Sequence, residues 1–183
     1  MTYRIDTKTV AVVSSLVGAG AAVRIVLGRI ALASPVAIYG VLIKVGLSET
    51  LAFVCGMVFG PVHGFITGVL TIVVSDLFMA PGPWTPYISG IIGVVGFAGG
   101  LLNMLKVNPS RRIMVASAVL LTLVSEFLQN LWVALFFGIP ILAALVSGVP
   151  SLLSALINNV ALFSTLGLRA IQMIHDLVPL DNK

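Results

Sequence analysis

The stretch "VFGPVHGFITGVLTIVVSDLFMAPGPWTP", which runs from Val58 to Pro86, places an acid and a tryptophan at the end of a long apolar run. Its first glycine and proline are typical of a turn, and so are the three prolines that follow the acid. The apolar run between them approaches the roughly 20 residues that a helix needs to cross a bilayer. The stretch therefore predicts a membrane-spanning helix that ends near Asp76 and opens into a loop with Trp84.

The composition of the whole chain agrees with a membrane protein. Of its 183 residues, 59% are hydrophobic and 9% are charged, and the mean hydropathy is +1.17. Soluble domains carry roughly 25% charged residues, so the charge content is too low for a soluble core of this size. We predict that residues 1–183 form a single transmembrane domain with no soluble domain attached.

Six apolar runs follow one another, so we predict an all-α integral membrane protein with six transmembrane helices. Glycines in the fourth run, among them Gly93, Gly96 and Gly100, predict close helix packing. Pro140 and Pro150 indicate a broken apolar loop before the last helix. The predicted spans cover about residues 9–27, 48–59, 65–78, 88–105, 113–137 and 151–174.

The segment between the first two spans, residues 28–47, mixes apolar and charged residues. A charge at the bilayer centre costs about 2.5–3.5 kcal/mol, so one helix that holds Lys44 and Glu49 at mid-depth is unfavourable. We predict a long loop or a re-entrant segment before the second span. Lys44 and Glu49 either pair with each other or hold a zwitterionic or acidic ligand. Within the first span, Arg24 needs a partner or a wet face.

Six spans place both termini on one side, and seven of the ten Lys and Arg residues fall on or near that side. The positive-inside rule therefore predicts cytoplasmic termini in a multi-pass protein of the cell membrane. The loop after the third span then faces outward. Asp76 is either a helix-end acid in contact with water or a ligand-binding acid. Trp84 and Tyr87 either belong to the interfacial aromatic belt or stack on a flat ligand.

Polar residues inside the last two spans are further candidates. Glu126 and Asn130 lie four residues apart, on one helix face with Gln129. An ionisable group inside a span suggests function, although a hydrogen bond between helices is the alternative. Trp132 lies near the same face. Asn158 and Asn159, in the last span, either bind a ligand or join helices.

Small residues recur every four positions in the first span, at Ala11, Ser15 and Ala19. Such a stripe lets another helix approach closely. It predicts either packing within this chain or a docking face for a partner subunit.

Other classes of protein lack their sequence signals here. There is no HExxH, GxSxG or Walker lysine motif, so we do not expect an enzyme or an ATP site. The single Cys55 excludes an intramolecular disulfide and a zinc site of paired cysteines, and we expect no metal and no cofactor. No basic face suggests nucleic-acid binding.

The stretches "FVCGMVFGPVHGFITGVLTIVVSDLF", "LIKVGLSETLAFVCGMVFGP", "LQNLWVALFFGIP" and "SALINNVALFSTL" together resemble the S-component of energy-coupling factor (ECF) vitamin transporters. This subunit captures the substrate. The resemblance implies six helices, cytoplasmic termini, and a vitamin or cofactor precursor bound from outside. It also implies a membrane coupling subunit and two cytoplasmic ATPases as partners, docked on the Ala11, Ser15 and Ala19 stripe. The substrate-binding positions that it implies are Lys44, Glu49, Asp76, Trp84, Tyr87, Asn130, Trp132, and Asn158 or Asn159, to which the in-span Glu126 is added.

Two rival functions stay open from the sequence. One is a stand-alone, proton-coupled secondary transporter of a small molecule that uses Glu126 or Asp76 as its proton site. The other is a membrane scaffold without a ligand. The sequence does not set the charge of the ligand, because cations and anions both border the predicted outer mouth.

Overall fold

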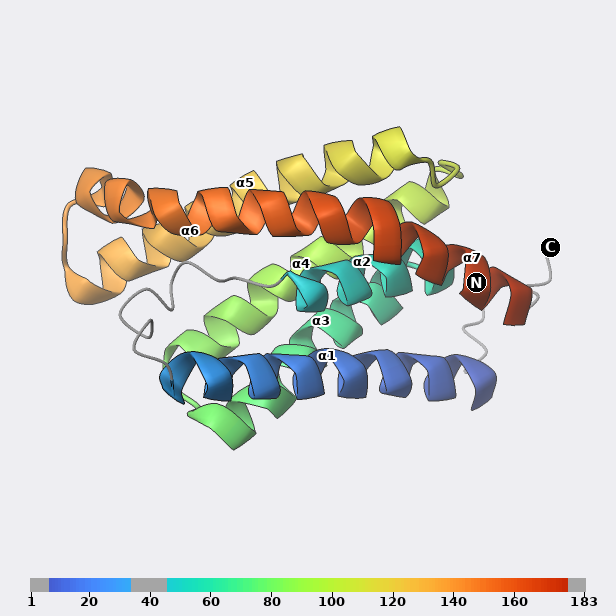
Figure 1. Ribbon diagram of the computed structural model, residues 1–183, viewed down its shortest axis with the longest axis horizontal. Coiled ribbons are helices and arrows are strands. Elements are labelled where there is room, and N and C mark those ends of the chain that lie inside the picture. Colours follow the sequence, from blue (N-terminus) through green and yellow to red (C-terminus); the bar gives the residue numbers. More distant parts are fainter. Residues whose placement is uncertain (1–6, 34–45, 178–183) are drawn as a thin grey trace.

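The computed structural model describes residues 7–33 and 46–177, and every regular element in these two ranges is a helix (Figure 1). α6, the π-helix η2 and α7 follow one another without a break and form one long, bent helix. α1 begins and α7 ends at the same end of the bundle. The elements are α1 (Thr7–Ala33), α2 (Leu47–Phe59), α3 (Pro61–Met79), α4 (Trp84–Met104), α5 (Arg111–Phe137), α6 (Ile141–Leu162), η2 (Phe163–Gly167) and α7 (Leu168–Leu177).

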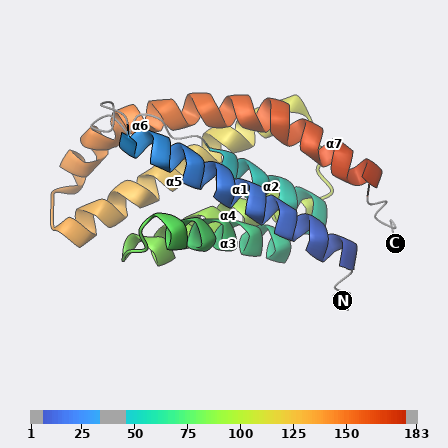
Figure 2. The ribbon, with the colours of Figure 1, turned by 60° about the horizontal axis from the view of Figure 1, so that its bottom comes forward.

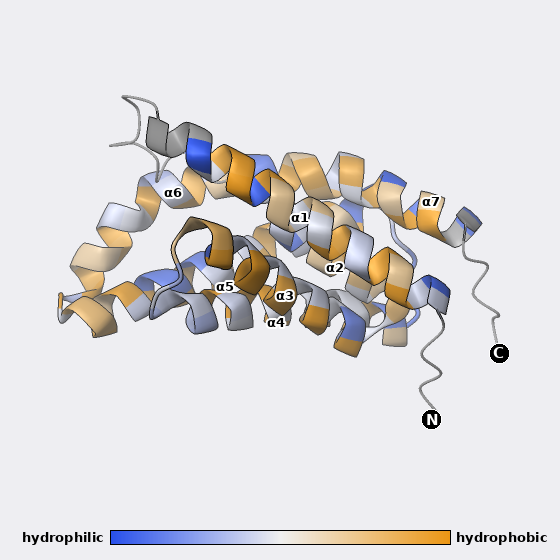
Figure 3. Cartoon of the chain, turned by 90° about the horizontal axis from the view of Figure 1, so that it is seen from below, coloured by the Kyte–Doolittle hydropathy of each residue, from blue (hydrophilic) through white to orange (hydrophobic). Residues whose placement is uncertain are grey.

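Five of the helical segments are long and apolar enough to cross a membrane, and α2 is a shorter apolar helix of 13 residues. Apolar residues recur along the helices (Figure 3). Large side chains such as Leu120, Leu135 and Leu142 are exposed on the outer surface. An apolar surface of this extent suits lipid rather than water, so the chain is a helical membrane protein.

The predicted second span, 48–59, agrees closely with α2. Its boundary with α3 is sharper than predicted, because Gly60 alone makes the turn. The φ of Gly60 is 95°, a conformation that favours glycine. Pro61 then occupies the first helical position, where a missing N–H does no harm.

Parts of three predicted loops are helical. α1 continues to Ala33, so residues 28–33 of the predicted loop at 28–47 belong to it. α4 begins at Trp84, so Trp84 and Tyr87 lie in its first turn. Pro86 is tolerated there because first-turn N–H groups have no partner within the helix. The predicted broken loop at residues 138–150 is also wrong, because α6 begins at Ile141 and contains Pro150. Pro150 is exposed and so is Val146, whose carbonyl loses its helical donor.

Glycines bring α2, α3 and α4 together at backbone distance. A Cβ added at Gly56 or Gly64 would collide with the backbone of Gly96, and one added at Gly68 would collide with the backbone of Ile92. The close packing predicted for the fourth run is confirmed at Gly96 and Gly100, whereas Gly90 meets nothing within 4 Å.

The larger of two apolar core clusters lies in the half of the bundle that contains the start of α1 and the end of α7. Phe53 of α2 packs on Phe163 of η2, with their ring centroids 4.9 Å apart. Met114 of α5 and Ile171 of α7 complete this cluster. Cys55 is fully buried in α2 as a small packed side chain, and the Thr67 hydroxyl donates to its Sγ.

The opposite half, which contains residues 80–83 and 138–140, is called the distal half here. α5 and α6 form a hairpin that extends past the ends of α3 and α4 (Figures 1 and 2). α2 does not reach this region, because Gly46 at its start lies against Asn159 of α6. Asn159 also contacts Thr122 of α5, so Thr122 lies at the same level. From there α5 continues to Phe137, a length of roughly 22 Å. The distal half of the hairpin therefore lies beyond the start of α2.

Candidate ligand-binding site

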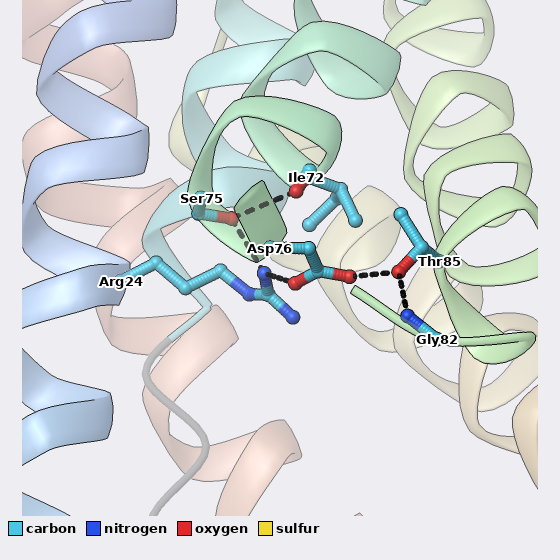
Figure 4. Close-up of polar contacts among 6 residues, drawn as sticks. All are labelled: Arg24, Ile72, Ser75, Asp76, Gly82 and Thr85. Atoms are coloured by element: carbon cyan, nitrogen blue, oxygen red, sulfur yellow. Dashed lines mark hydrogen bonds and ion pairs between the residues drawn. The ribbon is translucent and has the colours of Figure 1, made fainter. Parts of the chain in front are cut away.

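Asp76 is a structural clamp at the distal end of α3. Its side chain is 3% exposed and forms an ion pair with Arg24 of α1 (Figure 4). Its other oxygen accepts a hydrogen bond of 2.6 Å from Thr85 of α4, and Thr85 in turn accepts one from the N–H of Gly82. Asp76 thus joins α1, α3 and the first turn of α4, and Arg24 has the partner that its position in a span requires.

Aromatic residues join α4 to α5 in the distal half. The Tyr87 hydroxyl donates to the carbonyl of Leu128 at 2.8 Å, and its ring lies 5.9 Å from that of Trp132. Trp132 stacks on Phe136 with centroids 4.7 Å apart. Trp84, in contrast, is 37% exposed and packs beside Gly82.

Glu126 borders a pocket between α5 and α6. Its side chain is only 4% exposed, and its Oε2 accepts a hydrogen bond of 3.2 Å from Ser151 of α6. Asn130, one turn later, donates to the backbone carbonyl of Glu126 at 2.8 Å. The pocket has a volume of about 270 Å³ and is lined by Leu123, Glu126, Phe127, Asn130, Leu145, Gly148 and Leu152. One acid and one amide therefore face a mainly apolar cavity.

Asn159 lies deeper, at the level where α2 begins. Its Nδ2 donates to Thr122 of α5 at 2.8 Å, whereas its Oδ1 is buried with no hydrogen-bond partner among residues 7–33 and 46–177. Oδ1 points at Gly46, where any larger residue would collide with it. Asn158 faces a different direction and donates to Ser154 of its own helix at 3.4 Å.

The sequence-predicted ligand residues thus fall into separate groups. Glu126 and Asn130 share the pocket, and Tyr87 and Trp132 share the aromatic cluster. Asp76 is held in the clamp by Arg24 and Thr85, whereas Trp84 is exposed at the start of α4. Glu49 is half-buried in the first turn of α2. Lys44 lies outside the residues that the structure describes.

Sequence reasoning missed Gly148 as part of the pocket, Ser151 as a partner of Glu126, and Thr85 as a partner of Asp76. Gly148 was assigned to a loop, so its place opposite Asn130 was not visible. A small residue at Gly148 and a hydroxyl three positions later are a helical spacing, and this spacing is the signal that was available.

The Ala11, Ser15 and Ala19 stripe faces outward. All three side chains are exposed, as are Ser14, Gly18 and Ala22 beside them. A Cβ at Gly18 would meet nothing within 4 Å. The stripe is therefore unused by the helices that the structure describes.

The chain is similar to one curated protein of unstated activity. It is 28% identical over 122 residues to the UPF0397 protein of Streptococcus gordonii. The match covers 64% of this chain and 61% of the relative, so the chain spans about three fifths of the length of that relative. No family model matches the chain, and no solved structure matches it.

Proposed function

We propose that this membrane protein is the substrate-binding subunit of an ATP-driven importer of the energy-coupling factor type. It binds a vitamin or cofactor precursor at its distal half, which faces outward, with both termini in the cytoplasm. It then delivers the ligand together with a membrane coupling subunit and two cytoplasmic ATPases. The proposal assigns binding and delivery to this chain, and catalysis to its partners.

The observation that carries the proposal is the pocket with Glu126 and Asn130. Ligand pockets are mainly apolar and contain a few placed polar groups, and this cavity has that composition. An ionisable side chain inside a membrane span is expensive to keep, and it commonly marks a substrate pathway. The short length of α2 supports the proposal as well. α2 starts at Leu47, at the level of Asn159, so it does not extend along the distal half of the α5–α6 hairpin.

The exposed stripe of α1 supports the partner part of the proposal. Small side chains let a second helix approach closely in a membrane, where apolar surfaces alone give no strong association. Ala11, Ser15 and Ala19 present such a surface along just over two turns of one helix. A coupling subunit that packs there would leave the distal pocket free for its ligand.

Reconstituted uptake tests this function. The full chain is purified, its bound compounds are extracted and identified by mass spectrometry, and the identified compound is supplied in labelled form to proteoliposomes. We expect uptake only when the coupling subunit, both ATPases and ATP are present. A chain that retains no compound and supports no ATP-dependent uptake would contradict the proposal.

The docking face has its own variant and control. Ala19→Leu places a bulky side chain on the stripe, and we expect it to weaken co-purification of the coupling subunit by about tenfold. Ala116→Leu makes the same change at an exposed position of α5, away from the stripe. It should leave co-purification unchanged, and equal losses in both variants would count against docking on α1.

A stand-alone, proton-coupled transporter is the second candidate, because Glu126 is a buried carboxyl group beside a cavity. Asp76 is a poorer proton site, since Arg24 and Thr85 already hold both of its oxygens. Liposomes that contain this chain alone separate the two candidates. Uptake driven by a pH gradient without partners or ATP would favour the secondary transporter.

A further inference from the structure

We propose that the pocket between α5 and α6 is entered sideways, from the lipid, and that it takes the straight apolar chain of an amphiphilic molecule. The polar end of that molecule lies at the Asn130 end of the pocket. The part of this pocket in transport rests on the proposed function, whose substrate class would then be an amphiphile that dissolves in the outer leaflet. A lipid of the membrane itself is the other source of the same chemistry.

The mouth of the pocket is apolar and exposed. Leu123 and Phe127 of α5 border it and are 43% and 49% exposed. Leu145 and Leu152 of α6 lie on the other side and are half-buried. Glu126 also lines the pocket but is only 4% exposed, so apolar side chains form the mouth. Such a mouth suits entry from lipid, because water gains nothing by contact with apolar surface.

The depth of the pocket in the membrane also favours entry from lipid. α5 begins with Arg111 and Arg112, two exposed cations of the kind that lie at the cytoplasmic surface. Along the helix axis, Leu123 lies roughly 18 Å beyond Arg111 and Asn130 roughly 29 Å beyond it. The hydrocarbon core of a bilayer is about 30 Å thick. The mouth therefore opens into hydrocarbon, and its Asn130 end lies close to the outer headgroups.

The shape of the pocket suits a chain. Its lining residues extend from Leu123 to Asn130 on α5 and from Leu145 to Leu152 on α6, which is roughly 10 Å along each helix. A volume of about 270 Å³ over that length is a narrow slot parallel to the helices. Gly148 leaves room for the slot, because it adds no side chain to the wall. A single chain fits, whereas a helix, about 10 Å wide, does not.

The two ends of the slot differ in polarity. α5 and α6 are antiparallel, so Asn130 and Leu145 lie at the distal end, whereas Leu123 and Leu152 lie at the inner end. The amide of Asn130 is held at the distal end by its hydrogen bond of 2.8 Å to the carbonyl of Glu126. Amphiphiles of the outer leaflet keep their polar end outward, because each CH₂ buried in the membrane contributes about 0.8 kcal/mol. The slot has the same orientation.

Photolabelling tests the site and the orientation together. The full chain is placed in lipid nanodiscs and irradiated with decanol analogues that carry a photoreactive diazirine either at the end of the chain or beside the hydroxyl group. Mass spectrometry of the digested protein then locates the label. We expect the chain-end probe to label peptides around Leu123 and Leu152, and the hydroxyl-end probe to label those around Asn130 and Leu145.

Competition and variants test the shape of the slot. At equal mole fraction in the membrane, unlabelled decanol should displace the label about tenfold more effectively than adamantylmethanol, whose cage is too wide. Gly148→Leu fills the slot and should remove the label. Gly90→Leu is the matched control, because an added Cβ there meets nothing within 4 Å, and it should keep the label.

Gly148→Leu also presses on the side chain of Asn130, so a second variant removes one wall instead. Phe127→Ala widens the slot at a side chain that is 49% exposed, and we expect nearly the same thermal unfolding temperature. Adamantylmethanol should then compete to within about twofold of decanol.

Four results would overturn the inference: no label on the residues of the pocket, label in the reversed orientation, equal displacement by decanol and adamantylmethanol, or full labelling of a folded Gly148→Leu. Native mass spectrometry separates the two sources of the chain. A bound phospholipid identifies a lipid of the membrane, and a bound amphiphile that also enters liposomes with ATP identifies a substrate.

The inference fails separately from the proposed function. ATP-dependent uptake of a compound without an apolar chain, together with an unlabelled pocket, would keep the importer and discard the amphiphile. Labelling of the pocket without partner-dependent uptake of any compound would keep the pocket chemistry and discard the importer.

Discussion

α2, α3 and α4 meet through backbone atoms, whereas the distal parts of α5 and α6 meet through polar side chains beside a pocket. Glycines at positions such as Gly56 and Gly96 permit no added atom in the first region. The second region holds Glu126 and Ser151 in hydrogen-bond contact next to a cavity. The comparison separates a rigid support from a region with room for a ligand.

The two buried acids repeat this contrast. Asp76 is held by a cation and a hydroxyl from two other parts of the chain, so it fixes the arrangement of helices. Glu126 is as deeply buried, but it lines a pocket. The surroundings of an acid therefore decide its role, and position in the sequence alone does not.

Gly96→Ala should have the largest effect on stability. Its methyl group would collide with the backbone of Gly64, which cannot move as a flexible side chain can. We expect a loss of about 3 kcal/mol or more in the free energy of unfolding, at the upper end for overpacked sites. Denaturation in detergent measures it. Gly90→Ala is the control, since nothing lies within 4 Å of the added atom; equal losses would refute the backbone contact.

Removal of one partner from the Asp76 clamp should lower the free energy of unfolding by nearly as much. Asp76→Asn leaves Arg24 inside a span without its counter-charge, so we expect a loss of about 3 kcal/mol, the lower end for broken buried pairs, because Arg24 is 27% exposed. Arg29→Gln is the matched control, because it also removes an arginine from α1. Arg29 is exposed and donates to the carbonyl of Phe78 rather than to an acid, so its loss should cost less stability. A double-mutant cycle with Arg24→Gln should show coupling, and additive losses would disprove the ion pair.

The aromatic link between α4 and α5 should have a smaller effect. Tyr87→Phe removes only the hydroxyl that donates to Leu128, and one hydrogen bond contributes about 1 kcal/mol. Thermal unfolding of the purified variant measures the loss. An unchanged midpoint would mean that ring packing on Trp132 carries the whole contact.

Much of the fold follows from the sequence. The predicted second span differs from α2 by one residue at its start, because an apolar run that Gly60 ends follows the polar first turn of Ser48, Glu49 and Thr50. The predicted start of the last helix, at about residue 151, was wrong. Pro140 and Pro150 suggested a broken loop where α6 is helical from Ile141. Proline is tolerated in a membrane helix whose freed carbonyl finds other partners, and sequence spacing does not reveal those partners.

The site was predictable only in part. The spacing of Glu126 and Asn130 places them on one helix face, and the structure brings both to one pocket. The partner of Asp76 could not be predicted from the sequence, because Arg24 lies 52 residues away and only tertiary packing brings the two together. The need of Arg24 for a partner was nonetheless visible, since a charge inside a span requires one.

Native mass spectrometry of the full chain tests the central claim most directly, because it needs no knowledge of the ligand. The wild-type protein should carry a non-covalently bound small molecule, Asp76→Asn should retain it where it remains folded, and Glu126→Gln should lose it. A wild-type protein of bare mass, or a molecule retained equally by Glu126→Gln, would contradict ligand capture at the α5–α6 pocket.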